Sequence, residues 1–403
     1  ITTHYTLMAR ATEFQGSFLS RISIRRNQIV SMDVNHEQEL EELEYFQKHV
    51  AERFSDLITS PSPPPSSSSS AVSQPSDPIL SIPWLQNLLD VFMSCEAEFK
   101  AVLSTTQISK SPSLERVLPE MLDRILKALD LCNAVVNGID SVRQSRRFAE
   151  IAVTALKQRP LCDGSVRRAK RALTSLLIGL NADERRDRNS GGSGCSNQRR
   201  TTSRSWSFGT RSNVTGGGLY GQVVSKNWSA SKQIQAMVAN LVLPRGAEAS
   251  GPAMPVYIMS SVMVLVMWVL VAAVPCQTSS VLVAPLPLPK HQNWASAAMS
   301  IQERIGEEIK RKEKRCGGGG LMEEMQRMEK IGLSLMEFAE RFRFPADEEE
   351  EVEVAEKVDE MEEICRRMEV GLEDLQRQVR QVFHRLVRSR IEIVSLLEQA
   401  PAI

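Results

Sequence analysis

The longest uncharged stretch of this sequence lies between Glu248 and Lys290, and its centre is almost purely apolar. Within it, Val256–Val274 is a run of nineteen residues with a proline on each side and no polar side chains except two adjacent serines. As a helix this run is about 28 Å long, at about 1.5 Å per residue. The hydrocarbon core of a bilayer is about 30 Å thick. The segment therefore predicts either a membrane helix or a helix buried on all sides.

We expect this segment, residues 256–274, to associate with a membrane, as a single span or at its surface, with a buried core helix as the alternative. Lysines are found on both sides of it, at Lys232 and Lys290. The positive-inside rule therefore gives no orientation.

Two low-complexity tracts divide the rest of the chain. One is the Ser- and Pro-rich linker 60–78, and the other is the basic Gly-, Ser- and Arg-rich tract 182–230. Such compositions bury too little apolar surface to offset chain entropy, so both are predicted to be disordered. The predicted organisation is a basic N-terminal segment with an acidic amphipathic helix (1–59), the Ser/Pro linker (60–78), a helical core (79–181), the basic linker (182–230), a short helix with the apolar segment (231–290) and C-terminal helices (291–403).

Apolar residues recur at steps of three and four through most of the remaining sequence, which is typical of amphipathic helices. We therefore predict an all-α fold, a helical bundle with long amphipathic helices, disordered linkers and one apolar helix. Pro119 is expected in the first turn of its helix or at a bend. The C-terminal stripes suit an intramolecular core or a coiled coil. The predicted helices and stripes cover 34–58, about 83–102, 118–139, 141–158, 166–180, 231–243, 321–342 and 364–397.

The N-terminal helix, 34–58, combines acidity with an apolar stripe. Residues 33–56 contain eight acids and only two bases. A helix with such a stripe must pack on something, either its own core or another protein. We expect partners to bind helix surfaces rather than a pocket, with this helix involved. The stripe consists of Leu43, Phe46, Val50 and Phe54.

The net charge is zero, but charges are segregated into blocks. Residues 166–211 contain eleven Arg or Lys and three acids, whereas 347–363 is strongly acidic. Such blocks usually mark solvated or interacting surfaces. Trp206 and Phe208 lie in the basic block, and basic-aromatic mixtures bind acidic lipid headgroups or stack on nucleic acid. No recognisable nucleic-acid-binding fold surrounds them, so nucleic acid is not an expected partner.

No pattern in the sequence indicates catalysis, and we predict no catalytic, cofactor-binding or metal-binding residues. His36-Glu37 lacks the second histidine of a zinc-protease helix, because position 40 is Leu40. The glycine runs lack the lysine of a phosphate-binding loop. The seven cysteines are scattered and form no Cys-x-x-Cys pair, which favours reduced thiols in the cytosol: Cys95, Cys132, Cys162, Cys195, Cys276, Cys316 and Cys365.

The N-terminal region has no long apolar run of the kind found in secretory signals. Met8 is a plausible start, which makes residues 1–7 an upstream remnant. An Arg- and Ser-containing start with few acids also allows an organelle transit peptide. We expect a protein of the cytosol and of a membrane, either single-pass or peripheral.

Several blocks resemble the plant BYPASS-related family, specifically its ROH-like branch. They begin with Phe14-Gln-Gly-Ser-Phe-Leu and Arg21-Ile-Ser-Ile-Arg-Arg-Asn-Gln. They end with the block Gln378-Val-Arg-Gln-Val-Phe-His-Arg-Leu-Val-Arg-Ser-Arg. The resemblance runs from about Ala9 to Ile391.

This resemblance implies a non-enzymatic adaptor that associates with a subunit of the exocyst, the complex that tethers secretory vesicles to the plasma membrane. It implies a role in polarised secretion, such as seed-coat mucilage deposition. The wider family implies an alternative, a BYPASS-type regulator of a root-derived mobile signal in plant development. The family carries over no catalytic residues.

Overall fold

The computed structural model describes residues 41–58, 77–105, 112–180, 228–276, 286–314, 320–344 and 348–398. Every regular element in these ranges is a helix, so the predicted all-α fold is confirmed. Most of the two predicted linkers, 60–78 and 182–230, lies outside the described ranges, which include only 77–78 of the first and 228–230 of the second. Ala230, predicted as part of the second linker, is the first residue of a helix. The N-terminal residues 1–40 also lie outside the described ranges.

The first described helix spans residues 41–56. The elements that follow it are α2 (Ile82–Thr105), α3 (Pro112–Leu156), α4 (Asp163–Leu180), α6 (Ala230–Ala239), the 3-10 helix η2 (Gly246–Ser250), α7 (Ala253–Ala273), α8 (Asn293–Lys314), α9 (Glu323–Arg341) and α10 (Glu348–Glu398).

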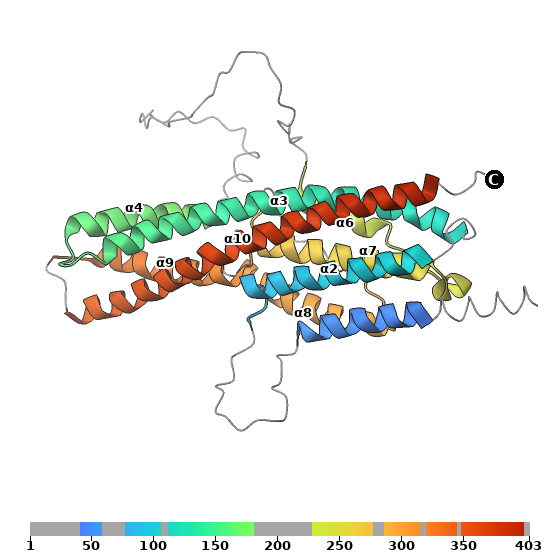
Figure 1. The fold of residues 1–403 in the computed structure, drawn as a ribbon. Helices are drawn as coiled ribbons and strands as arrows, with labels where there is room; N and C mark the ends of the chain where they lie inside the picture. The colour runs from blue at the N-terminus through green and yellow to red at the C-terminus, as the bar shows by residue number, and fades with distance from the viewer. Residues whose placement is uncertain are drawn as a thin grey trace, which may run out of the picture.

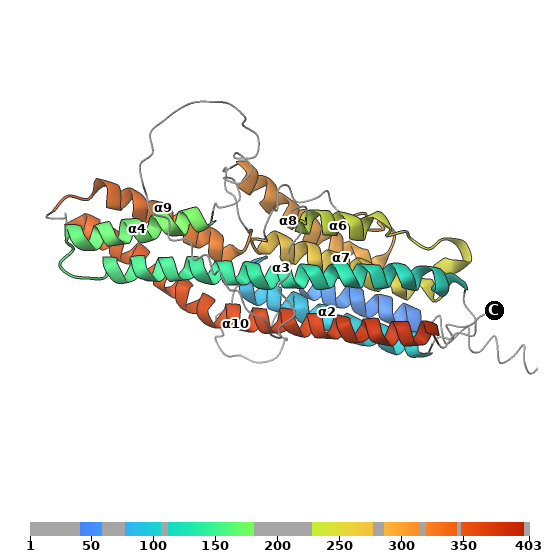
Figure 2. The ribbon, with the colours of Figure 1, turned by 90° about the horizontal axis from the view of Figure 1, so that it is seen from above.

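The elongated bundle is organised around its two longest helices, α3 and α10, which run antiparallel along its whole length (Figure 1). At one end, α4 and α9 complete a four-helix arrangement with them (Figure 2). At the other end, α7 packs against α3, and α2 packs against α10 and α7. The helix over 41–56, α6 and α8 lie outside them. Buried residues from both ends form one hydrophobic cluster.

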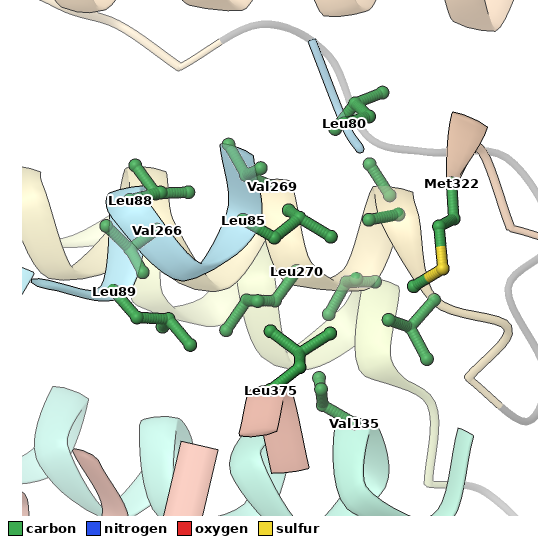
Figure 3. Packing of buried hydrophobic residues seen from close by; sticks show 14 of the residues in the cluster. Leu80, Leu85, Leu88, Leu89, Val135, Val266, Val269, Leu270, Met322 and Leu375 are labelled. Atoms are coloured by element: carbon green, nitrogen blue, oxygen red, sulfur yellow. The ribbon is translucent and has the colours of Figure 1, made fainter. Parts of the chain in front are cut away.

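Helix α7 is the centre of the wider end. Its composition leaves no polar face that could meet water, so neighbours must cover it on every side. All of its residues are buried, from Ala253 to Ala273. Figure 3 shows α7 packed between α2 and the helices below it, with a cluster formed by Leu85, Leu88, Leu89, Val135, Val266, Val269, Leu270, Met322 and Leu375.

Among the described residues, α7 is the one helix long and apolar enough to cross a membrane. Its complete burial within the bundle favours the core-helix alternative, because every face already contacts protein. The buried hydroxyl of Ser261 donates to the Tyr257 carbonyl at 2.8 Å, within the same helix. A membrane span formed by this helix stays a prediction.

The C-terminal end of α7 is joined to the segment that leads into α9. The last carbonyls of a helix have no intrahelical donor. Here Leu321 N–H donates to Ala272 O at 2.9 Å, and Met322 N–H donates to Ala273 O at 3.0 Å. A Cβ on Gly320 would lie 2.2 Å from Ala273 O, so only glycine fits. Gly320, the last residue of the glycine run 317–320, therefore has a packing role.

A second glycine explains why α3 is longer than predicted. The sequence suggested separate helices over 118–139 and 141–158, but α3 continues through both. A Cβ on Gly138 would lie 2.6 Å from the Pro275 carbonyl oxygen. Because Gly138 has no side chain, the segment that follows α7 can pass close to α3 at this position, and the helix continues through it. Pro119 lies inside α3, beyond its first turn.

The last C-terminal helix begins earlier than predicted. α10 starts at Glu348, inside the acidic stretch, because Val354, Val358 and Met361 already face the core. Downstream, the predicted stripe from Ile364 to Ile393 is buried. Helix α8 had no predicted boundaries of its own within the C-terminal helical region.

Glu324, in the first turn of α9, ties α9 to α2. Its Oε1 accepts the Ile82 N–H at 2.9 Å, which supplies a partner for the first turn of α2. Its other carboxylate oxygen is buried without a hydrogen-bond partner in the described structure. Burial raises the pKa of Glu324 to about 7. Between pH 4.5 and about 7, the folded chain therefore keeps a proton on Glu324 that the unfolded chain has released.

We expect Glu324→Gln to remove a pH dependence of stability. As pH rises from the unfolded pKa near 4.5 to about 7, ionisation of the buried carboxyl lowers the free energy of unfolding, by about 3 kcal/mol for this shift. The variant should match the wild type near the lower pH and exceed its stability at pH 8. Urea unfolding at several pH values measures this. Glu337→Gln, at an exposed site on the same helix, is the control, and an unchanged slope in Glu324→Gln would contradict the assignment.

Candidate interaction surfaces

The described residues hold no group of three or more His, Cys, Asp or Glu side chains that could bind a metal ion. Three histidines lie in the described ranges, and they are far apart in sequence: His49, His291 and His384. His36 lies outside those ranges.

The buried cysteine thiols are poorly suited to nucleophilic chemistry. None of the five described cysteines is in a disulfide, and four of them are buried. Burial raises the pKa of Cys95 to about 11 and the pKa values of Cys132 and Cys365 to about 12, so these thiols stay protonated at neutral pH. Cys162 is exposed, and hydrogen bonds from the backbone and side chain of Ser165 lower its pKa.

The helix over 41–56 docks on its own chain through the stripe predicted from the sequence. Its four stripe residues are at most 6% exposed. Phe46 packs on Phe99 of α2, with ring centroids 6.5 Å apart. Near the other end, Trp84 Nε1 donates to the Leu57 carbonyl at 3.0 Å. Of the two expected roles for this stripe, core packing is the one that the structure has, and the stripe is unavailable to a partner while docked.

Polar contacts with Glu98 hold this helix at one position along α2. Arg53 Nη1 donates to Glu98 Oε2 at 2.9 Å, and His49 Nδ1 lies 3.2 Å from Glu98 Oε1. The hydrogen bond from Arg53 is the main reason that the pKa of Glu98 is lowered. The outer face stays acidic, with Glu41, Glu44 and Glu52 exposed and Tyr45 61% exposed among them.

An apolar groove lies between the C-terminal ends of α2 and α10. It has a volume of about 690 Å³ and is lined mainly by carbon. Its lining includes Phe99, Ala101, Leu103, Ile391, Ile393 and Leu396. Because Phe99 also packs on Phe46, the acidic helix borders this groove.

A polar network beneath the groove holds its two walls together. The buried carboxylate of Glu96 on α2 accepts a hydrogen bond from Arg385 of α10 at 3.1 Å, and the Ser389 hydroxyl donates to the same carboxylate. Lys100 lies 2.9 Å from Glu96 and 3.0 Å from Glu392, so it bridges the two helices at the groove. Buried charges with several partners are costly to separate, so we expect a rigid groove.

The two charge blocks differ in how much of each the structure describes and in the contacts that they make. The described part of the basic block, 166–180, forms α4, and the rest of that block lies outside the described ranges. The acidic block forms the start of α10, where Lys157 contacts Asp359 and Glu362 at 3.1 and 2.5 Å. Arg327 of α9 pairs with Glu360 at 2.9 Å. Much of this acidic face therefore holds neighbouring helices in place.

Comparison with known proteins places the chain in a family. The family model described as Protein ROH1-like matches residues 9–397. The chain belongs to the ROH1-like family. It is 56% identical to Protein ROH1A of Arabidopsis thaliana, with 98% of each chain covered. It is 36% identical to Protein ROH1D of the same plant, over 95% of this chain and 96% of that protein. No solved structure matches it.

The family match confirms the resemblance to the ROH-like branch that the sequence blocks indicated, and this is not an enzyme family. In this ROH1-like chain the groove escaped sequence analysis. Its walls come from residues 99–104 and 389–396, which nothing in the sequence connects. The closest signal was the block Gln378–Arg390, which contains the part of α10 that leads into the groove.

Proposed function

We propose that this ROH1-like protein is a non-enzymatic adaptor that binds a subunit of the exocyst in polarised secretion, such as seed-coat mucilage deposition. Family membership over nearly the whole chain supports this proposal, as does the likeness to Protein ROH1A. The adaptor binds through a surface and carries out no chemistry of its own.

The groove between α2 and α10 is the observation that carries the proposal. Amphipathic helices bind other proteins by laying an apolar face into such grooves. The α10 wall, 389–396, offers about 10 Å of apolar surface, which suits about two turns of a partner helix. Ile391, 61% exposed, is the apolar anchor at its edge.

The acidic outer face of the helix over 41–56 defines the charge of the preferred partner. We expect its exposed carboxylates to form an acidic rim beside the groove, because Phe46 of this helix contacts the groove residue Phe99. Such a rim favours a partner helix with basic flanks. Its main contribution is to the association rate and to salt sensitivity, while the apolar groove supplies most of the affinity.

Ala101→Arg is expected to weaken binding of the exocyst subunit at least about ten-fold, because it places a long cation in the groove without disturbing the core. Ala101 is exposed and lines the groove. Ala97→Arg is the matched control, since Ala97 is exposed one turn earlier on α2 and does not line it. The measurement is the affinity of each purified exocyst subunit for the immobilised full-length chain.

Binding that survives Ala101→Arg unchanged would remove the groove from the interface. Failure of every exocyst subunit to bind the wild-type chain would contradict the adaptor function. The BYPASS-type regulator of a mobile signal would then be the function to pursue.

A further inference from the structure

The 51-residue helix α10 changes charge along its length. Residues 348–374 contain thirteen acids and three bases, whereas 375–398 contain five arginines, one histidine and only two acids. The acidic half is used inside the molecule, through Lys157 and Arg327. The basic half is largely unmatched by the helices around it.

We call the outer surface of this second half the basic face, and it comprises Arg377, Arg380, Gln381, His384 and Arg388. Their spacing of three and four residues places them on one side of the helix. All five are exposed, and with Arg385 they surround a shallow hollow of about 480 Å³.

The arginines of this region differ in their partners. Arg377 pairs with Asp374 at 2.7 Å, and Arg385 is held by Glu96. Within the described ranges, Arg380 and Arg388 have no carboxylate within ion-pair distance. This part of the surface therefore carries positive charge without an internal counterion, and an anionic partner would supply it.

Two exposed apolar side chains lie at the ends of the basic face. Val370 is 66% exposed and Ile391 is 61% exposed, and helical spacing places both on the same side as His384. Val370 and Ile391 are about 30 Å apart along the helix, at about 1.5 Å per residue. A basic strip between apolar residues suits a lipid surface, where cations meet headgroups and apolar side chains enter the boundary below them.

We infer that the basic face of α10 binds the anionic headgroups of a membrane surface. α10 lies along the outside of the bundle in both views, so a flat partner can reach it (Figures 1 and 2). An acidic protein would also match the charge, but it would not need exposed apolar side chains at both ends of the basic face. This contact is peripheral, leaves α7 in the core and does not depend on the proposed exocyst binding.

The test is sedimentation of the full-length chain with vesicles of phosphatidylcholine alone, or with about a third phosphatidylserine. We expect binding to the anionic vesicles only, and weaker binding at high salt. Arg380→Gln with Arg388→Gln should lower the affinity about 30-fold, because each basic residue at an anionic surface strengthens binding about five-fold. The matched control is Arg168→Gln with Arg171→Gln, which removes two exposed charges from α4.

Three results would overturn the inference. Equal binding to neutral vesicles would indicate insertion of an apolar segment instead. Equal losses in both double variants would indicate attraction to net charge without a site. In a competition assay, soluble polyglutamate is compared with added anionic vesicles of the same total charge. If polyglutamate removes more of the chain from the sedimenting vesicles, the basic face is a site for acidic proteins. Because Ala101→Arg should keep vesicle binding and the α10 variant should keep the exocyst subunit, the two proposals can fail separately.

Discussion

The variant with Leu265→Arg and Val269→Arg is expected not to fold. Both side chains are fully enclosed and belong to the hydrophobic cluster of the bundle. An unpaired charge in such a place costs several kcal/mol even after the structure relaxes. Two of them approach or exceed the stability of a typical domain, about 5–15 kcal/mol. Circular dichroism and thermal unfolding of the purified chain measure the loss.

Leu265→Met is the control for this experiment, because it conserves volume and should cost less than about 1.5 kcal/mol. The membrane alternative predicts something different for the arginine variant. Each arginine would oppose insertion by about 2.5–3.5 kcal/mol, and the protein would leave the membrane pellet with its helices intact. A folded, soluble double-arginine variant would therefore show that α7 is not the core helix.

The variant with Phe46→Ala and Phe54→Ala is expected to release the helix over 41–56 from the bundle. Both rings are buried, and removal of a buried phenylalanine side chain costs about 3–5 kcal/mol. Because a free helix of this length is marginal in water, the released segment should also lose helicity. Hydrogen exchange across 41–56 should rise strongly, with loss of helical circular dichroism.

Tyr45→Ala tests the exposed side of the same helix and should leave stability nearly unchanged. If the double phenylalanine variant instead kept its helicity and lost only its protein partner, the stripe would be a binding surface rather than part of the core. If it kept full partner binding, this helix would have no place in the interface.

Local spacing was sufficient to predict most of the helices. The stripes of α4, α9 and α10 are visible in the sequence, because a residue every third or fourth position places apolar side chains on one face. The predicted helix boundaries were less reliable. The helices predicted over 118–139 and 141–158 are parts of the single helix α3, and at Gly138 the chain leaving α7 passes too close for any side chain.

The amino-acid pattern alone requires residues 256–274 to avoid water, predicts helices for most of the chain and contains no known catalytic motif. It leaves open what surrounds α7, because a helix without a polar face can be buried in lipid or in protein, and here the packing of the other helices encloses it. The groove likewise required two segments almost three hundred residues apart to meet. The basic face of α10 became a candidate site for the same reason. Whether an arginine finds a counterion depends on which helices lie beside it, and local spacing carries no information about that.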